Sequence, residues 1–174
     1  MGLLSFRSAP TEVDEVVRPH LFLRPGEHIV AASPTEVATV LGSCVAVCLW
    51  NPVRGHGAVN HFLLPLGGDG AGGAAWRYGD TAVDLLVGRM LELGARRGEL
   101  VAKVFGGAHL LSAGTNGTPR LGSRNAEIAL ARLAGHQVQV EAQAILGRFG
   151  RKLVFHTDTG AAWVKTLGTE SGDE

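Results

Sequence analysis

The chain has 174 residues, of which 45% are hydrophobic, and its 16 basic and 16 acidic side chains give a formal net charge of zero. This length fits one compact domain, and the balanced charge argues against a broad basic surface for nucleic acid. No apolar run approaches the roughly 20 residues of a membrane span, and Met1–Phe6 lack the pattern of a secretory signal, so we expect a soluble cytoplasmic protein.

The first half of the chain predicts an irregular arm over residues 1–27 and then short strands. The runs of apolar and β-branched residues that predict strands are 28–32, 36–41, 44–50 and 57–64. A turn at Asn51–Arg54 joins the last two strands, with proline where its fixed φ suits a turn. The glycine-rich segment 67–73 is either a lid or an ordinary flexible loop.

The second half predicts two helices and further strands, in one domain that spans residues 28–167 and leaves a disordered tail over 168–174. A helix is expected over residues 80–97, because apolar residues recur there at three-and-four spacing. We expect Asp80 to cap it and Gly94 or Gly98 to end it. In chain order there follow a strand at 100–105, a loop at 112–119, a helix at 124–134 capped by Ser123, a strand at 138–145, and a hairpin formed by 152–156 and 161–166. This order predicts an α+β fold with a mostly antiparallel sheet system.

The hairpin between residues 44 and 64 suggests a catalytic pair. Facing residues of an antiparallel hairpin have a constant index sum, and a turn centred at 52.5 makes that sum 105. Cys44 and His61 satisfy it, so they are expected to face each other with Cβ atoms about 4.5–5.5 Å apart. A histidine at that distance could take the thiol proton and stabilise a thiolate. The turn at Gly42-Ser43 could leave backbone N–H groups free to bind an oxyanion.

Simpler interpretations remain open for these residues. Buried free cysteines are usually inert, and Cys48 is interpreted as a small core residue. Cys44 and Cys48 lie four apart on one strand, about 13 Å, which is too far for a disulfide. No histidines or cysteines have the spacing of a zinc site, and the 67–73 loop lacks the Gly-Lys-Ser/Thr ending of a phosphate loop. We therefore predict no metal and no cofactor.

Several motifs together resemble the CheD family of chemoreceptor glutamine deamidases. The site segment reads LGSCVAVCLW (41–50) followed by VNHFLLP (59–65). Further motifs similar to the family are WRYGDTAVDLLVGRMLELGA (76–95), KVFGGAHLL (103–111), LGSRNAEIA (121–129) and GRKLVFHTDTGAAWVKTL (150–167). The sequence departs from the family pattern at AILGRFGRK (144–152), and the arm at 1–27 has no counterpart in it.

The resemblance implies a layered α/β/β sandwich, shared with the catalytic domains of deamidating bacterial toxins. It implies a catalytic cysteine at Cys44, a histidine at His61 and a threonine at Thr39, with Ser43 as the alternative to Thr39. The implied activity is that of a protein-glutamine glutaminase acting on the cytoplasmic helices of chemoreceptors. For some members the resemblance also implies binding to the CheC phosphatase.

Two other functions stay open at this point. The first is a different Cys–His enzyme, such as a peptidase or a transglutaminase-like protein. The second is a non-enzymatic chemotaxis adaptor that binds receptors or CheC through the same fold.

Overall fold

The computed structural model describes residues 15–67, 72–109 and 120–168. Residues 1–14 of the predicted arm, 68–71 of the glycine-rich segment, the whole loop at 112–119 and most of the tail lie outside the described residues, so those predictions stay open. Within the described ranges, none of the helices is long and apolar enough to cross a membrane.

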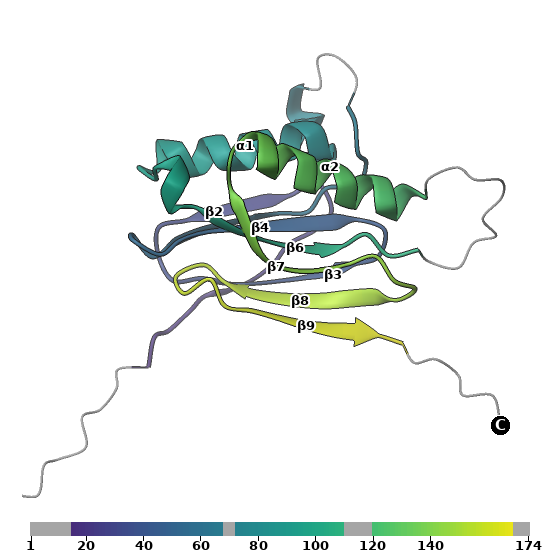
Figure 1. Cartoon of the computed structure of the whole chain (residues 1–174). Helices are drawn as coiled ribbons and strands as arrows, with labels where there is room; N and C mark the ends of the chain where they lie inside the picture. Colours follow the sequence, from purple (N-terminus) through teal and green to yellow (C-terminus); the bar gives the residue numbers. More distant parts are fainter. Residues whose placement is uncertain (1–14, 68–71, 110–119, 169–174) are drawn as a thin grey trace, which may run out of the picture.

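The described elements form three layers, with helices over one sheet and a second sheet beneath it (Figure 1). The helices are α1 (Gly79–Glu92) and α2 (Leu121–Gly135), with short 3-10 turns at η1 (Gly72–Arg77) and η2 (Arg97–Glu99). The strands are β1 (His20–Phe22), β2 (His28–Ala31), β3 (Glu36–Leu41), β4 (Val45–Asn51), β5 (His56–Asn60), β6 (Val101–Gly106), β7 (Gln139–Ile145), β8 (Gly150–His156) and β9 (Ala162–Leu167). The predicted layered α+β fold is confirmed.

Each sheet is mostly antiparallel. The sheet under the helices has five strands in the order β2-β5-β4-β6-β7, and the outer sheet has four in the order β1-β3-β8-β9. The parallel pairs are β6 with β7 and β1 with β3. The C-terminal hairpin of β8 and β9 confirms the prediction for 152–166.

Two apolar cores separate the layers. One lies between the helices and the five-stranded sheet and includes Val45, Val47 and Phe62. The other lies between the two sheets and includes Val37, Ala46 and Cys48. Alternate residues of β4 therefore point into different cores, as strand geometry requires. Cys48 is 1% exposed and is a core residue, as predicted.

Three elements differ from the sequence prediction. Part of the predicted irregular arm, His20–Phe22, is a strand that pairs with β3, a long-range contact that local patterns do not reveal. Helix α1 ends at Glu92, because Gly94 takes a φ of +99° and turns the chain. Helix α2 begins at Leu121 instead of 124, so Ser123 lies inside it and does not cap it.

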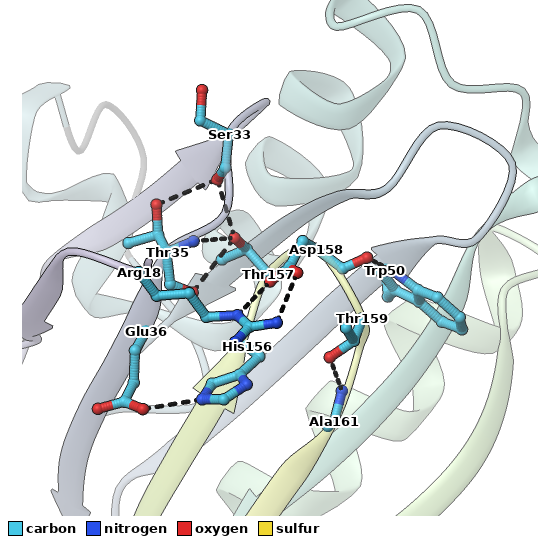
Figure 2. A network of polar contacts seen from close by, with 10 residues as sticks. All are labelled: Arg18, Ser33, Thr35, Glu36, Trp50, His156, Thr157, Asp158, Thr159 and Ala161. Atoms are coloured by element: carbon cyan, nitrogen blue, oxygen red, sulfur yellow. Dashed lines mark hydrogen bonds and ion pairs between the residues drawn. The ribbon is translucent and has the colours of Figure 1, made fainter. Parts of the chain in front are cut away.

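A polar cluster joins the start of the outer sheet to its C-terminal hairpin (Figure 2). The fully buried Thr157 hydroxyl accepts a hydrogen bond from the Thr35 backbone N–H at 3.0 Å and lies 3.2 Å from the Ser33 carbonyl oxygen, to which it donates. Arg18 binds both carboxylate oxygens of Asp158 at 2.8 Å. These contacts hold together the start of β3, the strand that carries Thr39, and the end of β8.

Candidate active site

The β4–β5 hairpin has a different register from the predicted one. Cys48 pairs with Val59 and Asn51 pairs with His56, so facing residues sum to 107 instead of 105. The turn is longer at its end because Gly55, with a φ of +65°, extends it before β5 begins. The prediction that Cys44 and His61 face each other directly is therefore wrong, and the pairing places Ala46 opposite His61.

Cys44 and His61 nevertheless share one face of the sheet. A register error of two residues preserves the face on which each side chain lies, because side chains alternate with a period of two. Cys44 packs against the inter-sheet core, and His61 meets the outer sheet in the same layer. Diagonal neighbours of this kind have backbones about 7–8 Å apart, still within reach of longer side chains. No hydrogen bond joins the thiol to the imidazole among the contacts of the described residues.

The segment before β4 is held through its carbonyl groups. The carbonyl oxygens of Gly42 and Cys44 each accept a backbone hydrogen bond at 2.9 Å, from Ala108 and Gly107 respectively. The Ser43 carbonyl accepts one from the Asn125 side chain at 2.9 Å. The N–H groups of Ser43 and Cys44 donate to no carbonyl within the described part of the chain.

Gly106, the last residue of β6, allows the chain to approach the Cys44 segment closely. Its φ is +107°, and a Cβ atom built there would lie 2.2 Å from the Cys44 carbonyl oxygen. Any larger residue would therefore push Cys44 out of place. This explains the glycine in the Phe-Gly-Gly segment at the end of β6.

His61 is held by Thr39 across the gap between the sheets. The Thr39 hydroxyl lies 2.7 Å from the Leu23 carbonyl oxygen and 2.8 Å from His61 Nδ1. A carbonyl can only accept, so the single hydroxyl proton goes to Leu23 and the Thr39 oxygen accepts from Nδ1–H. The proton of neutral His61 therefore lies on Nδ1, and Nε2 carries the basic lone pair. Nε2 is buried and has no hydrogen-bond partner among the described residues.

Burial favours the neutral forms of both Cys44 and His61. It lowers the pKa of His61 to about 4, so the imidazole is unprotonated at neutral pH. Burial also raises the pKa of the Cys44 thiol, an effect partly offset by the contact with its own backbone N–H. Cys44 is a half-buried free thiol. The resting site therefore holds a neutral thiol and a neutral base, and the thiolate forms only by proton transfer.

Two buried asparagines in this region were not singled out from the sequence. Asn60 Oδ1 accepts the Val47 N–H at 2.9 Å, where β4 and β5 would otherwise share a backbone bond. Asn125 lies on α2 among apolar residues and is fully buried. Its signal was a polar residue on the apolar face of a predicted helix, inside the motif LGSRNAEIA (121–129).

The family model for "CheD chemotactic sensory transduction" matches residues 63–166. The chain is also 48% identical over 150 residues to "Probable chemoreceptor glutamine deamidase CheD 1" of Anaeromyxobacter dehalogenans, covering 86% of each chain. This chain belongs to the CheD family. The CheD protein of Trichlorobacter lovleyi, named a probable chemoreceptor glutamine deamidase, is 48% identical over 139 residues, which cover 80% of this chain and 85% of its own.

The family model matches only part of the candidate site. The matched range includes Asn125 and the Phe-Gly-Gly segment but begins at Leu63, two residues after His61. The roles of Cys44, His61 and Thr39 therefore depend on the arrangement described above. The family membership predicted from the motifs is confirmed.

Proposed function

We propose that this chain deamidates glutamine side chains of chemoreceptors, with Cys44 as nucleophile, His61 as general base and acid, and Thr39 orienting the imidazole. The observation that carries the proposal is the fixed tautomer of His61. Thr39 holds the proton on Nδ1, and Nε2, which has no partner in the described part of the chain, lies in the same layer as a free, half-buried thiol. The names of the CheD relatives supply the substrate class.

The reaction proceeds in two halves. His61 Nε2 takes the thiol proton, and the Cys44 sulfur forms a bond to the carboxamide carbon of the substrate glutamine. The C–N bond then breaks, and ammonia leaves with the proton returned by Nε2, which leaves a thioester. Water attacks the thioester carbon with His61 as base, the C–S bond breaks, and glutamate and the Cys44 thiol are released.

The turn before Cys44 supplies the electrostatic part of the mechanism. The developing oxyanion is stabilised by the backbone N–H groups of Ser43 and Cys44, since neither group donates to a carbonyl among the described residues. No metal or cofactor takes part in this scheme.

The product adds a negative charge to the substrate. Each converted glutamine places a carboxylate on a receptor helix, and like-charge repulsion within a packed helical bundle shifts its signalling equilibrium. The partners of this function are the cytoplasmic helices of chemoreceptors, with the CheC phosphatase as a further binding partner.

Mass spectrometry of a cognate receptor cytoplasmic fragment tests the proposal. Incubation with the protein is expected to add about 1 Da at specific glutamines, as NH₂ is replaced by OH. Cys44→Ala and His61→Ala are expected to abolish the gain. Cys48→Ala is the matched control, because it removes the other free thiol, which is fully buried in the core on the same face of the sheet. A gain that survives Cys44→Ala would refute the mechanism. The absence of any gain with the wild-type protein would favour the non-enzymatic adaptor.

A further inference from the structure

The pairing that continues from β4 and β5 ends one residue after Cys44 in the chain and one residue after His61. Its last bridge joins Val45 and Phe62, whose N–H groups donate to each other's carbonyl oxygens at 3.1 and 3.0 Å. Cys44 and Leu63 lie one residue beyond that bridge. The backbone ladder therefore does not fix the segment that carries Cys44 against the segment that follows His61.

Asn125 of α2 spans this gap. Its Nδ2 group donates to the Ser43 carbonyl oxygen at 2.9 Å and to the Leu63 carbonyl oxygen at 2.8 Å. One side-chain amide thus joins the residue before the nucleophile to a residue two positions after the base. The two contacts connect segments that are 82 and 62 residues away from Asn125 in the sequence.

The amide comes with a cost that an apolar residue would avoid. Asn125 is fully buried, and its Oδ1 has no hydrogen-bond partner among the described residues. A buried acceptor without a partner destabilises a protein. The neighbouring buried positions of the same helix, Ala126, Ala129 and Leu133, are apolar. The contribution of Asn125 therefore lies in the two bonds that it donates.

We propose that Asn125 is a positioning residue that sets the Cys44 thiol and the Cys44 N–H relative to His61. The Ser43 carbonyl and the Cys44 N–H belong to one planar trans peptide and point in opposite directions. By holding that carbonyl on the α2 side, Asn125 aims the Cys44 N–H away from the helix. By holding Leu63 as well, it keeps the end of the His61 segment in register with Cys44. This inference rests on the proposed Cys44–His61 pair.

Steady-state kinetics on a receptor fragment test this role. Asn125→Ala is expected to lower kcat about 10- to 100-fold, the effect of misplacing reacting groups by about an ångström. KM is expected to stay within about twofold, because a buried residue does not touch substrate. Leu133→Ala is the matched control, since it truncates a fully buried residue of the same helix without reaching Ser43 or Leu63. All variants are assayed at a temperature at which circular dichroism shows them folded, with Asn125→Ser replacing Asn125→Ala if the latter is not.

The leucine control separates positioning from stability. Leu133→Ala is expected to lower the melting temperature at least as much as Asn125→Ala, yet keep kcat within about twofold of wild type. Equal loss of kcat in the two variants, or a wild-type kcat in Asn125→Ala, would overturn the inference.

Alkylation of Cys44 by iodoacetamide gives a readout that does not require deamidation. Asn125→Ala is expected to change the pH–rate profile of alkylation to that of His61→Ala. Adding Asn125→Ala to His61→Ala is expected to change the rate by no more than about twofold, because coupled residues are not additive. Fully additive effects would overturn the inference. If the wild-type protein deamidates no receptor but the coupling is present, the proposed function fails and the positioning role stands.

Discussion

Thr39 of the outer sheet and Thr157, which directly follows β8, are both buried, but their hydroxyl groups contact different kinds of group. Thr157 lies in the cluster of Figure 2, where its hydroxyl both accepts from Thr35 and lies within donating distance of the Ser33 carbonyl. Thr39 also uses its hydroxyl fully, accepting from His61 and donating to Leu23. The two threonines differ in the groups that their hydroxyls contact. The contacts of Thr157 end in backbone groups, whereas those of Thr39 lead to an imidazole whose Nε2 has no partner within the described residues.

The charges of the two regions follow the same contrast. In the Figure 2 cluster, the Arg18 guanidinium holds the pKa of Asp158 below its usual value, so the charged forms are favoured. At the candidate site, burial lowers the pKa of His61 and raises that of Cys44, so the neutral forms are favoured. Paired charges stabilise the fold in the Figure 2 cluster, whereas buried groups whose pKa is shifted toward the neutral form are typical of proton-transfer sites.

The largest expected effect is on the pH dependence of stability. The pKa of His61 is about 4 in the folded protein and about 6.5 in an unfolded chain. Between these values the unfolded state binds a proton that the folded state does not, so stability falls as pH falls from 6.5 to 4. Wild type is expected to lose about 3 kcal/mol through this group, and His61→Gln is expected to lack that loss.

Urea denaturation of both proteins between pH 8 and pH 4 measures this difference. The carboxylates with lowered pKa, such as Asp158 and Asp84, are present in both proteins, so subtraction of the two curves isolates His61. Parallel curves would show that the imidazole is not buried in its neutral form.

Thr157→Val is expected to give the next largest effect, on stability alone. The substitution keeps the shape of the side chain but leaves the buried Thr35 N–H without its acceptor at 3.0 Å. Loss of such a bond costs about 1–3 kcal/mol. The measurement is the midpoint of urea unfolding, with kcat on a receptor fragment expected to match wild type. A large loss of kcat in the folded variant would remove the contrast between the two threonines.

Much of the fold and part of the candidate site could be predicted from the sequence, and the parts that could not be predicted have physical causes. The strands, the C-terminal hairpin and the shared face of Cys44 and His61 follow from local patterns. The register of the β4–β5 hairpin could not be predicted, because it depends on where the turn is centred. Gly55, with its positive φ, lengthens that turn. The contacts of Asn125 with Ser43 and Leu63 join distant segments, so no local pattern could predict them.

Thr39→Val applies the same substitution at the candidate site and is expected to act on catalysis. It removes the oxygen that accepts from His61 Nδ1, so the proton is no longer fixed there and the Nε2 base is only partly available. A loss of about tenfold in kcat is expected, a fraction of the 10²–10⁴-fold that a general base contributes. Thr39→Ser is the control, because it keeps the hydroxyl. Equal activity of the valine and serine variants would remove Thr39 from the proposed mechanism.

Glu36→Gln is expected to have the smallest effect, although Glu36 lies on the same strand as Thr39. Its carboxylate lies 2.7 Å from His20 Nδ1 and 2.8 Å from His156 Nε2, and these hydrogen bonds lower its pKa. Glu36 is partly exposed and His20 is exposed, and polar contacts that reach solvent in this way contribute little. The melting temperature at pH 7 is therefore expected to change by no more than about 2 °C, with kcat unchanged. A larger shift that disappears in high salt would mean that the outer face of the sheet is less hydrated than its exposure suggests, and would place Glu36 with Thr157 among the groups that hold the fold.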